Sequence, residues 1–186
     1  MVSLSNLKKE DKDLCVKLHM ESYPGYLFTS RFPKKLLGKF YIKLIEYCEH
    51  NYLIQRDDKP VGLIIGGRNS KSARNSFIRE NFASLIIVLI KNPKFLIKKL
   101  LGVFIKSHNS KYKLRLLNIL VTPEYQSKPI TINAVSLFEE KLRESNEKTY
   151  GLSVQSNNVK AINFYIKNGC RIETIKNDSV FFFKNI

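Results

Sequence analysis

Residues 149–170 read TYGLSVQSNNVKAINFYIKNGC, and this stretch decides the fold. Thr149–Val154 predicts a strand, and the asparagine-rich turn after it leads into a helix over Asn158–Asn168. Asn158 is placed to cap that helix, and Gly169 suits the left-handed position after its last turn. Three residues of the helix share one side: Ala161, Phe164 and Tyr165. The stretch therefore predicts a strand that passes through a polar turn into an amphipathic helix.

A second strand–turn–helix unit lies upstream, where residues 117–126 read LNILVTPEYQ. Lys113–Val121 predicts a buried strand, Pro123 lies in the turn, and Ser127–Arg143 predicts a helix with one apolar side. Free backbone N–H groups and partial positive charge gather at the N-terminus of such a helix. We expect this end to bind an anion such as a pyrophosphate.

The remaining segments complete an α/β pattern with two helices near the N-terminus and a hairpin at the end. The other predicted elements are strands Val2–Leu7, Tyr52–Gln55, Val61–Gly66, Arg171–Ile175 and Ser179–Phe183, with helices Asp11–Ser22 and Lys34–His50. Residues 73–110 form a basic helical insert before the fourth strand, within which Pro93 begins a fresh helix. Strands joined through helices near the end of the chain require parallel or splayed pairing there. We predict one domain over 1–186, with a mixed sheet of about seven strands flanked by helices.

Composition limits the class of protein. The chain has 186 residues, 44% of them hydrophobic, which fits one folded domain. The three cysteines have no CxxC partner and the three histidines are scattered, so we predict neither a disulfide framework nor a metal site. The N-terminus lacks a signal-peptide pattern and the longest apolar run, Leu85–Ile90, is too short to cross a bilayer. We therefore expect a soluble, cytoplasmic protein.

The formal net charge of +16 indicates either a lysine-rich solvated surface or a polyanionic partner. Coenzyme A, a nucleotide sugar, nucleic acid and an anionic membrane are all polyanions of this kind. The insert places Lys94, Lys98, Gly102 and Lys106 on one helical ridge. That ridge either makes peripheral contact with an anionic membrane, covers an acceptor site, or is the solvated side of a packed helix. No RNA-binding or helix-turn-helix motif accompanies the lysines, so no nucleic-acid partner is expected.

Two motifs, V-x-P-E-Y-Q over Val121–Gln126 and N-x-x-A-x-x-F-Y-x-K-x-G over Asn158–Gly169, resemble the GNAT N-acetyltransferase family. The strong resemblance covers residues 113–184. More loosely, the helix start between Phe32 and Tyr41 and the basic insert resemble bacterial members associated with surface-sugar biosynthesis.

The resemblance implies an α/β GNAT fold in which the strands Leu117–Val121 and Thr149–Val154 part to admit the pantetheine arm of acetyl-CoA. The residues it implies for coenzyme binding are Ile119, Leu120, Val121, Gln126, Ser127, Lys128, Ile130, Thr131, Asn158, Ala161 and Tyr165. Tyr165 matches the tyrosine that protonates the leaving thiolate, a role suited to a phenol near sulfur. A small amine acceptor would attack the thioester directly, and the preferred acceptor is an amino sugar on a nucleotide or lipid carrier. We expect the protein to be a monomer or a homodimer.

Three points leave alternatives open. Pro129 stands where the family's phosphate loop has its first glycine, and Thr131 replaces a small residue, so one alternative is a GNAT-like binding module without catalysis. Glu21 is the candidate general base, against the reading of a solvated carboxylate at a helix end. The alternative reading of Tyr165 is a half-buried helix aromatic with a packing role.

Overall fold

The computed structural model describes residues 1–23, 28–93, 110–126, 129–176 and 178–186. In chain order the elements, with η for 3-10 helices, are β1 (Val2–Asn6), η1 (Lys9–Asp11), α1 (Lys12–Ser22), η2 (Phe28–Arg31), α2 (Lys34–Tyr47), β2 (His50–Arg56), β3 (Lys59–Gly67), α3 (Ser70–Glu80), α4 (Phe82–Ile90), β4 (Arg115–Val121), η3 (Pro123–Tyr125), α6 (Pro129–Glu144), β5 (Thr149–Gln155), α7 (Val159–Lys167), β6 (Arg171–Lys176) and β7 (Ser179–Asn185). The chain therefore folds as a single α/β domain, as predicted.

The strands form one seven-stranded sheet in the order β1-β2-β3-β4-β5-β7-β6. Neighbours pair antiparallel except for β4 and β5, which run parallel. The helix α6 makes the crossover between those two strands, which parallel pairing requires. The mixed sheet predicted from the sequence is confirmed, including the closing hairpin of β6 and β7.

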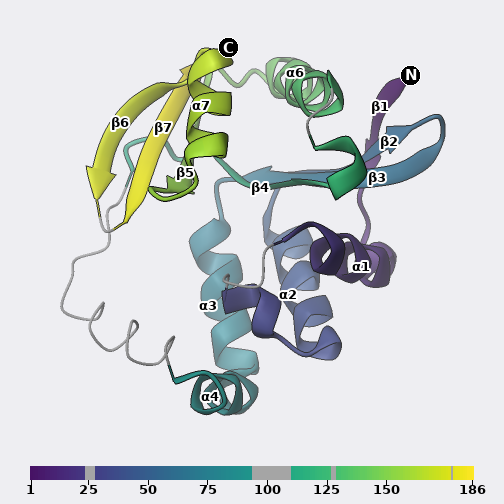
Figure 1. The fold of residues 1–186 in the computed structure, drawn as a ribbon, viewed down its shortest axis with the longest axis vertical. Helices are drawn as coiled ribbons and strands as arrows, with labels where there is room; N and C mark the ends of the chain where they lie inside the picture. Colours follow the sequence, from purple (N-terminus) through teal and green to yellow (C-terminus); the bar gives the residue numbers. More distant parts are fainter. Residues whose placement is uncertain (24–27, 94–109, 127–128, 177) are drawn as a thin grey trace.

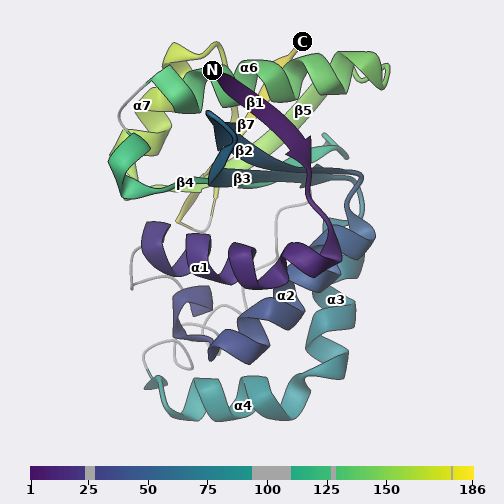
Figure 2. The ribbon, with the colours of Figure 1, turned by 90° about the vertical axis from the view of Figure 1, so that its right-hand side faces the viewer.

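Helices cover both faces of the sheet. Figure 1 shows α1 and α2 below it and α6 and α7 above it, and Figure 2 shows α3 and α4 extending the lower layer away from the strands. The strands alternate between the two layers, so Leu63 and Ile65 of β3 pack downward while Ile64 packs upward. This alternation divides the core into a lower and an upper hydrophobic cluster.

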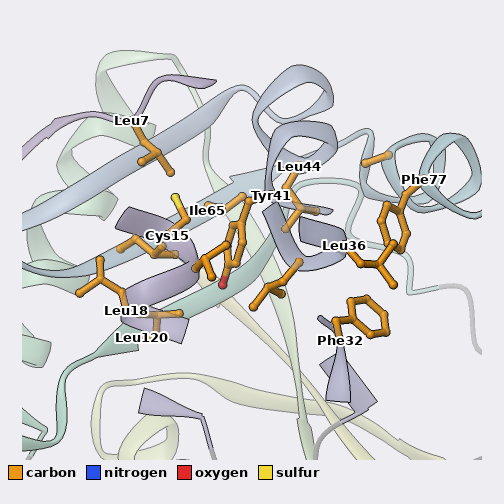
Figure 3. Packing of buried hydrophobic residues seen from close by; sticks show 14 of the residues in the cluster. Leu7, Cys15, Leu18, Phe32, Leu36, Tyr41, Leu44, Ile65, Phe77 and Leu120 are labelled. Atoms are coloured by element: carbon orange, nitrogen blue, oxygen red, sulfur yellow. The ribbon is translucent and has the colours of Figure 1, made fainter. Parts of the chain in front are cut away.

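The lower cluster joins α1, α2 and α3 to the sheet. Tyr41 of α2 is fully buried among Cys15 of α1, Ile65 of β3 and Leu120 of β4, as Figure 3 shows. Farther from the sheet, Phe32 stacks on Phe77 of α3 with ring centroids 5.8 Å apart. Buried aromatic pairs of this kind add to the stability that burial itself provides. The helices below the sheet and the strands thus share one continuous apolar layer.

Two predicted boundaries change in the structure. The helix α2 ends at Tyr47 rather than at His50, because Cys48 already has extended backbone angles (φ −103°, ψ 142°) and His50 begins β2. The helix α3 begins at Ser70, three residues before the stretch 73–110 that the sequence predicts as an insert. The predicted lysine ridge over 94–106 and most of the helix expected after Pro93 lie outside the described residues.

Candidate active site

The two parallel strands separate almost as soon as they meet. The one register pair between β4 and β5 in the described chain joins Arg115 to Gly151, where the Gly151 N–H donates to the Leu114 carbonyl at 2.9 Å. Beyond that point β5 pairs along its whole length with β7, and β4 pairs with β3. A wedge therefore opens between β4 and β5 toward their C-terminal ends.

A β-bulge on β4 accompanies the separation. Ile65 of β3 pairs with Asn118 while the next residue, Gly66, pairs with Leu116, so Leu117 is the extra residue. Such a bulge bends its strand and increases its local twist. It also breaks the alternation of side chains: Leu117 packs with the lower cluster, and the next residue, Asn118, faces the same layer, where it contacts Tyr41.

Hydrogen-bond alternation shows which backbone groups face the wedge. The Thr122 N–H donates to the Val61 carbonyl of β3 at 2.9 Å, so backbone groups of Leu120 also point to β3, and those of Ile119 and Val121 point toward β5. On β5 the same alternation applies. The Ser156 N–H donates to the Asp178 carbonyl beside β7 at 2.9 Å, so the backbone groups of Ser153, three residues earlier, point to the other side, toward β4. Ile119, Val121 and Ser153 thus offer polar groups to a chain lying in the wedge.

A cavity of about 630 Å³ occupies the wedge and continues beneath it. Its lining comes from β4, β5 and α7 on one side and from α1, η2, α2 and α3 on the other. The residues that line the cavity from β4, β5 and α7 include Ile119, Ser153, Gln155, Asn158, Ala161 and Tyr165. The cavity therefore brings together four residues proposed from the sequence: Ile119, Asn158, Ala161 and Tyr165. The volume falls within the range of small-molecule sites.

The helix α7 presents two of these residues. The Asn158 Oδ1 accepts from the Ala161 N–H at 3.1 Å, which confirms the predicted cap, and Asn158 also lines the cavity. Gly169 follows the helix with φ +82°, as predicted for its left-handed position. Tyr165 is 7% exposed, and burial, reinforced by Tyr23 and Cys170, raises the pKa of its hydroxyl. The phenol therefore stays protonated at neutral pH.

The start of α6 lies after the end of β4. Pro129 is its first residue and has no N–H to donate, which leaves the amides of Ile130 and Thr131 in the first turn. The Thr131 Oγ1 is buried without a hydrogen-bond partner in the described chain. The Gln126 Nε2 donates to the Val121 carbonyl at 3.0 Å. An anion at this helix end would supply the missing acceptor for Thr131, so the residues present fit a diphosphate despite the proline.

The other side of the cavity holds a chain of hydrogen-bonded polar groups that the sequence did not reveal. The Tyr23 hydroxyl donates to the Asn118 Oδ1, the Asn118 Nδ2 donates to the Tyr41 hydroxyl at 3.2 Å, and the His19 Nδ1 lies 2.8 Å from the Tyr41 hydroxyl. Burial lowers the pKa of His19 to about 4, so its imidazole is uncharged at neutral pH. His19, Tyr23 and Asn118 line the cavity.

Charge in the cavity has one sign. Lys71 and Arg74 of α3 line it on the side of the helices below the sheet, and no carboxylate is among the described residues that line it. Glu21, the base candidate from the sequence, is exposed near the end of α1 and does not line the cavity, whereas His19 two residues earlier does. This side of the cavity therefore suits a ligand that carries an anionic group.

Three of the coenzyme-binding residues proposed from the sequence are directed elsewhere or lie outside the described residues. The backbone of Leu120 is directed to β3 and its side chain packs in the lower cluster. Ser127 and Lys128 lie outside the described residues. In the described chain no group of three or more His, Cys, Asp or Glu side chains could hold a metal ion, and no helix there has the length and apolar character to span a bilayer.

The parted parallel strands and the helix start beyond them fit an acyltransferase. Residues 13–170 match the model of the Acetyltransferase (GNAT) family, and the chain belongs to that family. Acetyl-CoA is the acyl donor that such acetyltransferases use. No curated protein sequence is significantly similar to the chain.

Solved structures share the fold over the full chain. PH1933 from Pyrococcus horikoshii OT3 is 15% identical, with TM-score 0.67, covering 100% of this chain and 99% of that one. The PaiA N-acetyltransferase of Thermoplasma acidophilum, solved with coenzyme A, is 14% identical with TM-score 0.64 and the same coverage. Arabidopsis thaliana Naa50, solved with the bisubstrate analogue CoA-Ac-MVNAL, is 18% identical with TM-score 0.58, again at 100% and 99% coverage. At these identities the likeness concerns the fold.

Proposed function

We propose that this chain is an acetyl-CoA-dependent N-acetyltransferase whose acceptor is a small amine that carries an anionic group. The observation that carries the proposal is the single cavity that joins the β4–β5 wedge to the cationic side at Lys71 and Arg74. An amino sugar on a nucleotide or lipid diphosphate combines an amine with such an anion. The looser resemblance to members associated with surface-sugar biosynthesis stays a prediction, and it selects the acceptor to be tried first.

The coenzyme arm would lie in the wedge, held by backbone groups of Ile119, Val121 and Ser153. The diphosphate would be received by the first turn of α6, with Thr131 as a side-chain donor. Asn158 would contact the arm through its Nδ2, since its Oδ1 is engaged in the cap. When bound, acetyl-CoA supplies an activated acyl group as a thioester.

The chemistry needs one acid and a neutral amine. The amine nitrogen attacks the thioester carbonyl carbon, the C–N bond forms, and the C–S bond breaks as Tyr165 gives its proton to the sulfur. The attacking nitrogen loses its extra proton to solvent water, because no carboxylate lines the described cavity, and the Tyr165 phenolate then takes a proton back from water. The uncharged chain of His19, Tyr41, Asn118 and Tyr23 would orient the acceptor without repelling the positive charge that forms on the attacking nitrogen.

The first experiment titrates the protein with acetyl-CoA by calorimetry and then measures thiol release with a panel of acceptors. The panel contains a nucleotide-linked amino sugar, the same sugar without phosphate, and a short peptide with a free N-terminus. We expect the nucleotide-linked sugar to give the highest kcat/KM. No binding at millimolar acetyl-CoA would support the non-catalytic binding module instead, and preference for the peptide would reject the acceptor class.

Substitution of Tyr165 tests the proposed acid. Tyr165→Phe removes only the hydroxyl, and we expect kcat to fall about 100-fold or more with the acetyl-CoA Kd little changed. Tyr52→Phe is the matched control, since Tyr52 lies on β2 away from the cavity. Equal kcat values for the two variants would show that Tyr165 is not the acid and is a packing residue.

A further inference from the structure

The helix α4 exposes an unusual apolar surface. It reads FASLIIVLI from Phe82 to Ile90 and contains no charged residue. Leu85, Val88 and Leu89 are buried, but four large side chains on the outer side are exposed: Phe82 by 62%, Ile86 by 39%, Ile87 by 54% and Ile90 by 66%. Both views place α4 at the end of the molecule farthest from α6 (Figures 1 and 2). An exposed apolar patch of this kind marks an interaction surface.

A second cavity of about 400 Å³ lies beside this helix, between α4 and the start of α2. Four of its lining side chains are cations, Arg31, Lys35, Lys39 and Lys91, and the others include Leu36, Ile87 and Val88. The cavity therefore combines an apolar wall with a basic rim. We use the name α4 basic face for the four exposed α4 side chains together with these four cations.

Among the described residues, no carboxylate lines the basic cavity. The sequence has no Asp or Glu between Glu21 and Glu46, nor between Glu80 and Glu124. The two carboxylates nearest to it along the chain are engaged elsewhere: Glu46 pairs with Lys9 and Lys43, and Glu80 with Lys43, each at 3.0 Å. The net charge of +16 thus includes a region where cations adjoin exposed aliphatic groups.

We propose that the α4 basic face docks on an anionic lipid bilayer, with Phe82, Ile86, Ile87 and Ile90 in the interface and the basic cavity taking a phospholipid headgroup phosphate. Apolar groups at headgroup depth and cations toward anionic lipid are the two contributions to interfacial binding. A second copy of the chain fits poorly, because it would bring the same cations face to face. Nucleic acid would satisfy the cations and leave the exposed isoleucines in water.

The position of this face matters for the reaction, an extension that rests on the proposed function. The 3-10 helix η2 separates the two cavities: Thr29 lines the large one and Arg31 lines the basic one. Docking through α4 would bring η2, and with it the Thr29 side of the large cavity, toward the bilayer. An acceptor amine on a lipid carrier could then enter without leaving the membrane surface.

The test is sedimentation of the full chain with vesicles, without acetyl-CoA, so that its outcome is independent of catalysis. We expect binding to vesicles with 30% phosphatidylglycerol in phosphatidylcholine, no binding to pure phosphatidylcholine, and strong weakening at high salt. Equal binding to both vesicle types, or none to either, would overturn the proposal.

Matched variants locate the surface. Ile90→Ser should weaken vesicle binding about fivefold, the effect expected for losing one partly inserted aliphatic side chain. Ile175→Ser, at the same 66% exposure on β6, should leave it unchanged. Lys35→Gln with Lys39→Gln should weaken it about 25-fold, on about fivefold per lysine near an anionic surface. The control pair is Lys167→Gln with Lys176→Gln, on α7 and β6.

Two further arms separate other ligands. A duplex DNA that binds more tightly than the vesicles, with loss on the Lys35 and Lys39 changes and none on Ile90→Ser, would replace the membrane by nucleic acid. Inorganic phosphate at millimolar concentration should compete only weakly, and complete displacement of the protein from vesicles would reduce the site to one for free phosphate. Circular dichroism melting of each variant checks that the fold is intact.

Discussion

The buried histidine of the acceptor side makes the stability of the protein depend on pH in a calculable way. His19 is 1% exposed and its pKa is lowered by burial from 6.5 to about 4. A histidine with a depressed folded-state pKa contributes stability that is fully present above pH 6.5 and is lost as pH falls toward 4. For pKa values of 6.5 unfolded and about 4 folded, the free energy of unfolding falls by about 2 kcal/mol between pH 7 and pH 5 on this account.

The assay is urea unfolding at pH 7 and pH 5 for the parent chain and for His19→Gln. Glutamine still offers an oxygen to the Tyr41 hydroxyl but does not titrate, so the variant should lose about 2 kcal/mol less than the parent over this interval. Burial also lowers the pKa of His50, which contributes equally in both proteins and cancels in the comparison. Equal losses in the two proteins would refute the assignment of the pH dependence to His19.

Three other changes test the coenzyme side and the sheet. Pro129→Gly restores an amide at the start of α6 and should tighten acetyl-CoA binding about threefold to tenfold by calorimetry, from the net value of one hydrogen bond; an unchanged Kd would mean that this amide does not face the diphosphate. Asn158→Ala should lower the free energy of unfolding by about 1 kcal/mol, and Asn158→Ser should restore that stability without restoring coenzyme affinity, unless Asn158 acts only as a cap. Gly62→Ala should destabilise the fold by about 1–3 kcal/mol in thermal melts because its Cβ would lie 2.3 Å from the Leu120 carbonyl oxygen, whereas Gly38→Ala, whose Cβ meets nothing nearer than 3.8 Å, should not.

Local signals account for what the sequence predicted well. The cap at Asn158, the positive φ of Gly169 and the strand over Thr149–Gln155 each depend on residues within one turn or one strand. The end of α2 was predicted wrongly because it does not depend on local signals. Apolar periodicity continues through Cys48, but the backbone becomes extended there to start β2. Periodicity reports which residues are buried, and it does not report where a helix must end for the next strand to pair.

The acceptor side could not be predicted because its parts are far apart in the chain. Tyr23 and Asn118 are 95 residues apart, and Asn118 and Tyr41 are 77 apart, so their contact exists only once α1 and α2 pack beneath β4. A weak signal was present, since Asn118 is a polar residue within an apolar strand and a buried amide requires partners. Its partners, and with them the role of His19, follow from packing that no local pattern encodes.

The β4–β5 wedge lacks the hydrogen bonds that a fully paired ladder would have. Other contacts must therefore hold strands β1, β2, β3 and β4 against strands β5, β6 and β7. The helix α6 does so: Phe138 contacts Tyr52 of β2 and Tyr150 of β5, with ring centroids 6.5 and 6.1 Å away.

A buried polar group on the same helix adds to this connection. The Tyr150 hydroxyl donates to the Glu139 Oε1 at 2.8 Å, and the Lys184 Nζ donates to it at 2.7 Å from β7. The helix that would receive the diphosphate is therefore also the brace across the wedge. Since one rigid element sets both the width of the wedge and the position of the anion site, the loss of one amide at Pro129 need not displace the coenzyme, because the remaining donors stay aligned with the gap.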